Sequence, residues 1–563
     1  MGELARDAIE SALEAALNAA QEAETLPRVP TAAISVERPQ NPEHGDYASN
    51  IALRLASTMK RKPLEVAEAI AAEVATGPMI EAVAVAPPGF INVRLSQAWK
   101  LSQIDAILAT GPSWGSVDVG QGKRVQVEFV SANPTGPLQV GNGRGAVLGD
   151  ALASVLGAAG YEVAREYYVN DAGGQIRTFV ATLSARYQQQ FGRDVDLPED
   201  GYLGAYVVSL AEQIKEEDGE QYLVEVGEPP PEALGRRGLA IMLEAIGADL
   251  SLLGVEFDHW FSEQSLFEAD AAQGDQSTYE VTMGRLREAG FIAEDEGAVW
   301  FRSTKLGEEK DNVLVRRTGE PTYFASDIAY HYDKFVRRGF DWVIDIWGAD
   351  HQGHVTRTKA ATEAVGGPPG GLDVLLYQLV HLRRGEERVR MSKRTGEIVT
   401  LRELLEDVGR DVTRYFLLQR SADAQMDFDL ELATSQDPKQ NPVSYVQYAH
   451  ARCASIGRTA EEVGIAADGD VQQLGDVTEL QLIDAMLRLP ELVEMMAEKL
   501  EPHHLTTYAM ELAQHFTQFY GACRVVDLDA PDRSRARLKL TLAAQQVLAR
   551  TLGLMGVSAP ESM

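Results

Sequence analysis

The sequence predicts a multidomain α/β protein whose central domain contains a doubly wound parallel sheet. Its 563 residues exceed what one hydrophobic core normally organises, so several domains are expected. An apolar, β-branched run at 125–130 is followed by a glycine-rich turn and a helical segment, which is the start of a strand–helix–strand unit. From residue 431 to 563 the apolar spacing is helical, which predicts an all-α domain.

The N-terminal part, residues 1–112, is predicted to form an α+β domain. Residues 5–23 are alanine-rich with helical apolar spacing, and the stretch 41–50 forms a turn before another helix. The stretch 87–95 predicts a turn followed by a strand. Composition and spacing alone assign this domain no chemistry.

Residues 113–430 are predicted to form the central domain, with an acidic, helical insertion at about 185–300. After the insertion, the apolar strand beginning at Asp341 ends in a polar cluster, and ligands of open α/β sheets bind at such strand ends. Asp350, His351 and His354 have spacing that permits a metal site. We favour nucleotide or substrate contacts, because no cysteine or glutamate strengthens the metal alternative.

The net charge argues against a nucleic-acid partner without excluding one. The chain has 84 acidic and 52 basic residues, a balance of −32, and such a field repels phosphate. The basic run at 533–539 is the clearest local exception, with a solvated helix face as the alternative. Cys453 and Cys523 are too few for a disulfide framework, so we expect two reduced, buried thiols. With no apolar run near 20 residues, we expect a cytoplasmic protein without a membrane span. We also expect a monomer.

The stretch 125–150 carries the strongest chemical signal. The free N–H groups of a first helical turn and the helix dipole favour an anion there. Glycines at 141, 143 and 145 would let a ligand approach the backbone, although helix packing also uses glycines at such junctions. The spacing fits neither GxGxxG nor GxxxxGKS, which excludes the two commonest phosphate loops.

Two further patterns indicate ligand contacts. Tyr323 and Asp327 are four residues apart, so on a helix they share one face. The carboxylate could bind a guanidinium by two parallel hydrogen bonds and the ring could stack on it; a surface or capping aspartate is the alternative. The basic loop at 388–397 could clamp nucleotide phosphates, or it could be exposed without function.

The amino-acid sequences of these stretches resemble those of one protein family. Residues 137–142, Pro-Leu-Gln-Val-Gly-Asn, resemble the His-Ile-Gly-His signature of class I aminoacyl-tRNA synthetases, with Gln139 and Asn142 replacing the two histidines. Residues 391–394, Met-Ser-Lys-Arg, resemble the second signature, KMSKS, with Arg390 replacing its first lysine. The two amides lose any cationic contribution but remain hydrogen-bond donors. Further stretches resemble bacterial arginyl-tRNA synthetases, at 41–50, 131–137, 166–175, 323–330, 441–452 and 553–563.

This resemblance covers almost the whole chain. It implies an N-terminal additional domain that contacts tRNA, a Rossmann-type catalytic domain, and a C-terminal anticodon-binding bundle. It also implies that ATP and L-arginine give arginyl-adenylate, and that transfer to tRNA(Arg) gives arginyl-tRNA, AMP and pyrophosphate. Mg²⁺ would accompany the nucleotide, and the protein itself would hold no metal. Members of this family are unusual in needing bound tRNA for the first step.

The resemblance also implies roles for single residues. Gln139, Asn142 and Lys393 would be catalytic. Tyr323 and Asp327 would bind the guanidinium; Ser131, Asn133 and Gln352 would hold the α-amino and carboxylate groups, with help from Glu128. The ATP site would contain Pro137, Gln139, Gly141, Asn142, Met391, Ser392 and Lys393. The tRNA contacts would include Phe90, Asn92, Tyr445, Tyr448, Arg452 and Met563.

Two other hypotheses remain open at this stage. A non-catalytic paralogue that binds tRNA or arginine would explain the loss of both histidines. An adenylate-forming enzyme of the same fold could act on another amino acid or amine. The intact Met-Ser-Lys loop and the anticodon-type domain favour an active synthetase, because a decayed enzyme would be expected to lose more than two residues.

Overall fold

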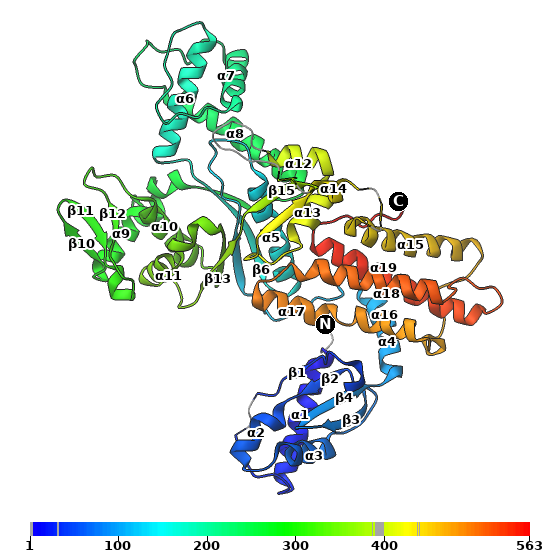
Figure 1. Ribbon diagram of the computed structural model, residues 1–563. Coiled ribbons are helices and arrows are strands. Elements are labelled where there is room, and N and C mark those ends of the chain that lie inside the picture. Colours follow the sequence, from blue (N-terminus) through cyan, green and yellow to red (C-terminus); the bar gives the residue numbers. More distant parts are fainter. Residues whose placement is uncertain (1–3, 31–32, 386, 389–398, 436, 439) are drawn as a thin grey trace.

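The computed structural model describes residues 4–30, 33–385, 387–388, 399–435, 437–438 and 440–563. Figure 1 shows an N-terminal domain (blue) at the bottom, a large central domain, and a helical bundle (orange to red) at the right. Among the described residues, no helix has both the length and the apolar character that a membrane crossing requires.

The N-terminal domain is an antiparallel sheet, of strand order β1-β2-β4-β3, covered by helices. Its first helix buries Ile9, Leu13 and Leu17, which are four residues apart and therefore line one face. The helix, the turn and the strand predicted in this part are confirmed. The elements are α1 (Ala5–Glu22), β1 (Val36–Glu37), β2 (Tyr47–Ser49), α2 (Ile51–Met59), α3 (Pro63–Glu73), β3 (Ile80–Ala86), β4 (Phe90–Leu95) and the connecting α4 (Gln97–Thr110).

Ion pairs fasten this domain to the C-terminal bundle. Arg6 lies 2.7 Å from Glu494, and Arg38 lies 2.9 Å from Glu491. Both glutamates belong to α17 (Leu489–Lys499), so one bundle helix receives both contacts.

The central sheet has five parallel strands in the order β14-β13-β5-β6-β7. The first strand in sequence is therefore central, the next two are added on one side, and the last two on the other. This reversal creates a crevice at the carboxyl ends of β5 and β13, and the doubly wound fold class is confirmed. The strands are β5 (Arg124–Glu128), β6 (Glu162–Val169), β7 (His259–Ser262), β13 (Trp342–Gly348) and β14 (Leu372–Tyr377).

Two lobes extend from this sheet. Helices between β6 and β7 form the lobe at the top of Figure 1, and a small antiparallel sheet, β10-β11-β12, with α9, α10 and α11 forms the lobe at the left. Strand β7 lies between them in sequence, so it divides the insertion predicted at 185–300 into two excursions. The helices are α5 (Val140–Ala158), α6 (Gly174–Gln190), α7 (Ala205–Asp218), α8 (Glu232–Leu253), α9 (Thr278–Glu288), α10 (Tyr323–Tyr332), α11 (Val355–Ala364), α12 (Leu401–Val408), α13 (Arg410–Leu418) and α14 (Leu430–Thr434). The remaining strands are β8 (Ala269–Asp270), β9 (Gln276–Ser277), β10 (Ile292–Asp295), β11 (Ala298–Phe301), β12 (Asn312–Val315), β15 (Val380–Arg384), β16 (Glu387–Arg388) and β17 (Met426–Asp429).

The glycines of α5 have two different uses. A Cβ at Gly143 would lie 2.7 Å from Leu401, and one at Gly145 would lie 3.0 Å from Tyr377, so close packing requires both glycines. Gly141 has open space where its Cβ would be. Gly141 therefore leaves room for a ligand beside the backbone. At Gly143 and Gly145, helix packing explains why a glycine is present.

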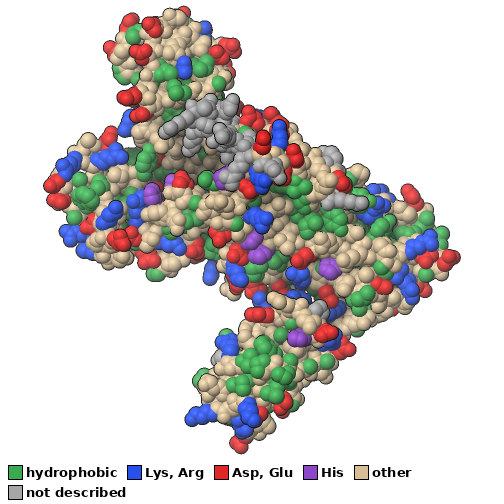
Figure 2. All heavy atoms as spheres, in the orientation of Figure 1, with side chains coloured by type: hydrophobic (Ala, Val, Ile, Leu, Met, Phe, Trp, Pro, Cys, Tyr) green, Lys and Arg blue, Asp and Glu red, His purple; other side chains and the backbone are tan. Residues whose placement is uncertain are grey.

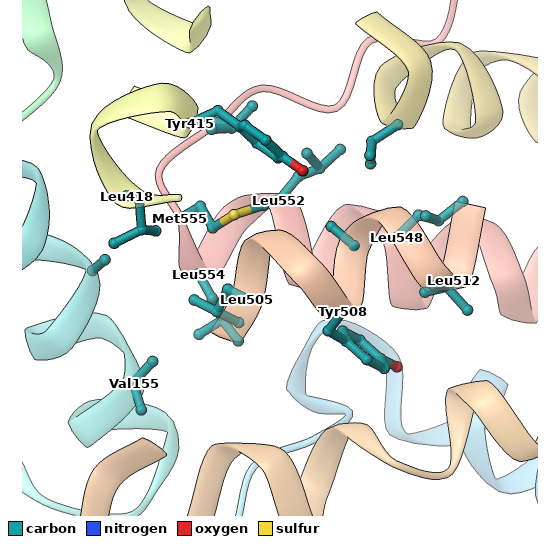
Figure 3. Packing of buried hydrophobic residues seen from close by; sticks show 14 of the residues in the cluster. Val155, Tyr415, Leu418, Leu505, Tyr508, Leu512, Leu548, Leu552, Leu554 and Met555 are labelled. Atoms are coloured by element: carbon teal, nitrogen blue, oxygen red, sulfur yellow. The ribbon is translucent and has the colours of Figure 1, made fainter. Parts of the chain in front are cut away.

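The C-terminal bundle shares its core with the central domain. Figure 3 shows Val155 of α5 and Tyr415 of α13 beside apolar side chains of the bundle, including Tyr508 and Leu552. The helix whose N-terminus reaches the crevice is thus packed, at its other end, against the bundle. Both cysteines are buried and unpaired, as predicted. The bundle helices are α15 (Pro442–Glu462), α16 (Val477–Met486), α17, α18 (His504–Ala522) and α19 (Pro531–Leu554).

Candidate active site

The crevice contains a pair of buried carboxylates. Glu128, the last residue of β5, is the register partner of Asp345 on β13. Two like charges on neighbouring strands repel each other, and Lys334 lies between them. Its Nζ is 2.5 Å from Glu128 Oε2 and 2.7 Å from Asp345 Oδ1. The lysine therefore neutralises part of the negative charge at the strand ends.

The chain leaves β5 through a strained turn. Val130 and Ser131 have φ angles of +68° and +40°, in the left-handed region that costs a non-glycine residue about 1–3 kcal/mol. The turn is held because Ser131 Oγ donates to Glu128 Oε1 at 2.9 Å and accepts the N–H of Tyr168 at 3.1 Å. Ser131 and Glu128, both predicted to bind arginine, are thus in direct contact.

The turn that resembles the first signature caps α5. Gln139 is the N-cap residue, and its N–H donates to Asn142 Oδ1 at 2.9 Å. Because the amide oxygen is used in this cap, the amide nitrogen of Asn142 remains available as a donor to a ligand. Pro137 lies exposed just before the cap.

Residues that follow the second signature in the sequence form hydrogen bonds with the turn that caps α5. Met391, Ser392 and Lys393 lie outside the described residues. Further along the chain, Thr400 forms a β-bridge with Gln139, and the N–H of Leu401 donates to the carbonyl oxygen of Leu138 at 2.8 Å. Thr400 and Leu401 are therefore fixed beside the N-terminus of α5.

A cavity of about 310 Å³ lies beside the crevice. Tyr323 and Asp327 fall on the predicted helix, α10, and therefore on one face of it. Tyr323, which is 49% exposed, lines the cavity with Ser326, and Asp327 is half-buried next to them. The rest of the wall comes from the loop after β6 and the start of α6, from the segment after β7, and from the segment between β12 and α10.

Sequence reasoning missed Glu263, which lines the same cavity. Its side chain is buried, Ser326 hydrogen-bonds it, and its Oε2 has no hydrogen-bond partner among the described residues. The hydroxyl of Tyr168 is buried and equally unpartnered within that part of the chain. A buried carboxyl oxygen that lacks a donor within the described residues could accept a hydrogen bond from a ligand, a cationic ligand included. Glu263 directly follows β7, so the rule that ligands bind at strand ends could have found it; its place inside a supposed insertion hid it.

Asp327 has an unusual proton affinity. Burial, together with the charges of Glu263 and Glu128, raises its pKa to about 7, although His331 and Arg357 act in the opposite direction. Burial likewise raises the pKa of Glu263 above its usual value. A bound guanidinium would reverse both effects, because an opposite charge favours the ionised carboxyl.

Arginine affinity should therefore depend on pH in a defined direction. Only ionised Asp327 can pair with a guanidinium, so below pH 7 binding must first remove a proton. We expect affinity to be nearly constant from pH 7 to 8 and to fall about tenfold for each unit below 7. Calorimetric titration with L-arginine from pH 5.5 to 8 checks this, and Asp327→Asn should flatten the profile. An affinity of the native protein that is constant down to pH 5.5 would contradict it.

Asn133 and Gln352 lie exposed at the rim of the crevice. The amide of Asn133 donates to Gln175 Oε1 at 2.6 Å. Gln352 belongs to a 3-10 turn, Ala349–His354, directly after β13. Across the described ranges, no three or more His, Cys, Asp and Glu side chains form a group that could hold a metal, so the metal alternative at this strand end gains no support.

The residues predicted to contact tRNA divide into exposed and buried ones. On α15, Tyr448 is exposed, and the guanidinium of Arg452 lies 5.0 Å from the centre of its ring. The same guanidinium lies 5.4 Å from Tyr520 of α18, which sequence reasoning missed. Tyr445 is half-buried and donates to Thr517 Oγ1 at 3.1 Å.

The other predicted contacts lie at the chain end and in the N-terminal domain. Met563 and Phe90 are exposed. Asn92 is buried in β4, so its side chain presents no open surface. Each is a position at which the family resemblance predicts tRNA, and burial makes Asn92 the weakest of them.

Basic side chains of the run at 533–539 form ion pairs with carboxylates of the protein itself. Arg537 lies 2.7 Å from Glu479, and Lys539 lies 2.6 Å from Asp105. Figure 2 shows acidic and basic side chains interspersed over the visible face. The alternative of a helix face, here paired with neighbouring carboxylates, explains this run better than a phosphate footprint.

Comparisons with known proteins agree with this architecture. Three family models match: an arginyl tRNA synthetase N terminal domain at residues 6–95, a tRNA synthetases class I (R) catalytic domain at 103–436, and a DALR anticodon binding domain at 446–563. A relative named arginine–tRNA ligase from Dehalococcoides mccartyi is 52% identical over 531 residues, covering 94% of each chain. The chain belongs to the arginyl-tRNA synthetase family.

Other relatives extend this similarity over the full length. An arginine–tRNA ligase from Heliobacterium modesticaldum is 47% identical and covers 100% of this chain and 99% of its own. The solved arginyl-tRNA synthetase of Thermus thermophilus has the same fold, with a TM-score of 0.75 at 24% identity, covering 99% of this chain and 100% of that one. The predicted family and fold class are confirmed, whereas the domain limits at 112 and 430 and the roles of single residues stay predictions.

Proposed function

We propose that this chain activates L-arginine with ATP and attaches it to tRNA(Arg). The arginine carboxylate attacks the α-phosphorus of ATP, which gives arginyl-adenylate and pyrophosphate. A hydroxyl of the terminal ribose of tRNA then attacks the adenylate carbonyl, which gives arginyl-tRNA and AMP. The observation that carries this proposal is the cavity lined by α10 and the segment after β7. There the charges of Asp327 and Glu263 interact, and Oε2 of Glu263 has no hydrogen-bond partner among the described residues.

The arginine side chain would lie in this cavity. Asp327 and Glu263 supply carboxylates that suit the fork of a guanidinium, and Tyr323 supplies a ring for stacking. The α-ammonium would meet Glu128, which Ser131 orients through the 2.9 Å hydrogen bond. Asn133 and Gln352 at the rim would bind the remaining polar atoms of the amino acid, including its carboxylate.

The nucleotide phosphates would lie at the N-terminus of α5. Gln139, Gly141, Asn142 and Pro137 surround that end, and Met391, Ser392 and Lys393 would close over it with Mg²⁺ bound to the nucleotide. None of these side chains forms a covalent intermediate; they position the reactants and stabilise the charge that develops on phosphorus.

The tRNA would span all three domains. In the bundle, the stacked group of Tyr448, Arg452 and Tyr520 would receive anticodon bases, with Tyr445 and Met563 beside it. Phe90 and Asn92 would support the tRNA from the N-terminal domain. We also propose that the enzyme acts as a monomer in the cytoplasm, where its tRNA is charged for translation; equilibrium sedimentation tests the first point.

Arginine-dependent ATP–pyrophosphate exchange tests the proposal directly. We expect exchange with L-arginine when tRNA(Arg) is present and little without it. The loss of both signature histidines favours a second candidate, a non-catalytic paralogue that binds tRNA or arginine. No exchange in either condition, with tRNA still bound, would support that candidate. Exchange with another amino acid in preference to arginine would instead indicate a related adenylating enzyme.

A further inference from the structure

One buried chain of hydrogen bonds joins the two ends of the proposed arginine site. It begins on α10, one turn after Asp327, where His331 Nδ1 lies 2.7 Å from the backbone oxygen of Asp327. His331 Nε2 lies 3.0 Å from Asp345 Oδ2. The other oxygen of Asp345 binds Lys334, which reaches Glu128 at 2.5 Å. The backbone of the guanidinium-binding residue is therefore linked, without a gap, to the carboxylate proposed for the α-ammonium.

The chain is almost completely closed to solvent. The exposed fractions of its side chains are 3% for His331, 1% for Asp345, 0% for Lys334 and 8% for Glu128. A π-helical turn, Asp333–Arg337, follows α10 directly, and Lys334 belongs to it. Such turns often occur at functional sites, and here His331 and Lys334, on either side of the junction, both reach Asp345. Buried ion pairs contribute little net stability, so their use here points to a positioning role.

The two ring nitrogens of His331 both lie at hydrogen-bond distance from oxygen atoms. A carbonyl oxygen can only accept, and so can an ionised carboxylate. Both ring nitrogens face such acceptors, an arrangement that a ring with a proton on each nitrogen would satisfy fully. Although burial opposes ionisation, Lys334 and His331 hold the pKa of Asp345 below its usual value. Burial raises the pKa of Glu128, and the charge of Lys334 acts against that rise.

We propose that these four side chains form an ionic strut that fixes the spacing between the guanidinium cavity and the α-amino site, with protonated His331 as its positioning residue. The proposal rests on the function proposed above. Because α10 cannot shift toward or away from β13 without breaking a buried charged hydrogen bond, the distance between the two ends of the site is fixed. A fixed distance would favour amino acids with a side chain of the length of arginine. One methylene is commonly worth about 10–200-fold in discrimination.

His331→Gln is the sharpest variant. Glutamine has a similar reach, but its side chain offers donors at only one of its two polar atoms, so it cannot donate from both ends as the imidazolium does. We expect KM for arginine to rise about tenfold or more with a smaller change in kcat. We also expect the preference for arginine over homoarginine, which is one methylene longer, to shrink by a similar factor. Both are measured by pyrophosphate exchange in the presence of tRNA(Arg).

Two controls keep the proposal falsifiable. His515→Gln changes a partly buried histidine of α18 and should leave the preference for arginine unaltered. Nitrogen NMR of histidine-labelled native protein at pH 7.5, which needs no variant, should show both ring nitrogens of His331 protonated. A neutral ring would overturn the proposal, and so would an unchanged preference in His331→Gln, even with reduced kcat. If native protein shows no arginine-dependent exchange, the proposed function fails, while the ring spectrum still decides whether the charged strut exists.

Discussion

Asp327→Asn is expected to lower kcat/KM for arginine by about two to three orders of magnitude. The substitution keeps the shape of the side chain, removes its charge and replaces one acceptor oxygen with an NH2 donor. Loss of one partner from a buried, hydrogen-bonded charge pair costs about 2–5 kcal/mol, because the remaining charge is left unpaired. Citrulline, the neutral analogue of arginine, should lose almost nothing, so the preference between the two should nearly vanish. Pyrophosphate exchange with each amino acid, in the presence of tRNA(Arg), measures this preference.

A matched aspartate separates the charge of Asp327 from general effects. Asp373 lies on β14, 3.2 Å from Lys359, and both side chains are 41% exposed. Pairs of that kind contribute about 0–1 kcal/mol, so Asp373→Asn should change the kinetics by less than about fivefold. If Asp327→Asn kept the preference for arginine over citrulline, the guanidinium would have to bind elsewhere. Glu263→Gln would then identify whether the second carboxylate carries the recognition alone.

Local patterns were sufficient for the parts of the site that lie within one element. The spacing of Tyr323 and Asp327 predicted a shared helix face because four residues make about one helical turn. The change from an apolar run to a glycine-rich stretch predicted the strand, the turn and α5, because each of these elements is indicated by residues that are neighbours in the sequence. The pairing of Thr400 with Gln139, by contrast, joins distant segments. Only the resemblance of both stretches to one family indicated that they meet.

Features that arise from tertiary packing left no such local pattern. Lys334 looks like an ordinary surface lysine in the sequence, and only the π-helical turn and the pairing of β5 with β13 bury it between two carboxylates. The positive φ angles of Val130 and Ser131 are also invisible in sequence, since most valines avoid that region and surrounding bonds must impose it. Glu263 was hidden because β7 is short and stands between two long excursions.

Gln139→Ala and Asn142→Ala are each expected to lower kcat about 10²–10³-fold with little change in KM for arginine. A donor aimed at a transferring phosphate gains most of its strength in the transition state, and removing one such donor typically costs about 2.7–4 kcal/mol. The sequence resemblance places the two amides where the class I signature has histidines, so we expect them to act as side-chain donors of that turn. Single-turnover and steady-state exchange kinetics separate the two parameters. A loss shared equally between binding and turnover would contradict this role.

Asn142 allows the donor to be separated from the helix cap. Its Oδ1 accepts the N–H of Gln139 at 2.9 Å, so Asn142→Ala also removes a capping-box hydrogen bond worth about 0.5–1.5 kcal/mol of stability. Asn142→Asp keeps that oxygen and replaces the amide nitrogen with a second, negative oxygen that repels phosphate. If the nitrogen is the catalytic donor, Asn142→Asp must be at least as inactive as Asn142→Ala while melting at a higher temperature. If the cap alone matters, Asn142→Asp must retain native turnover, and the chemistry then depends on the backbone N–H groups of α5.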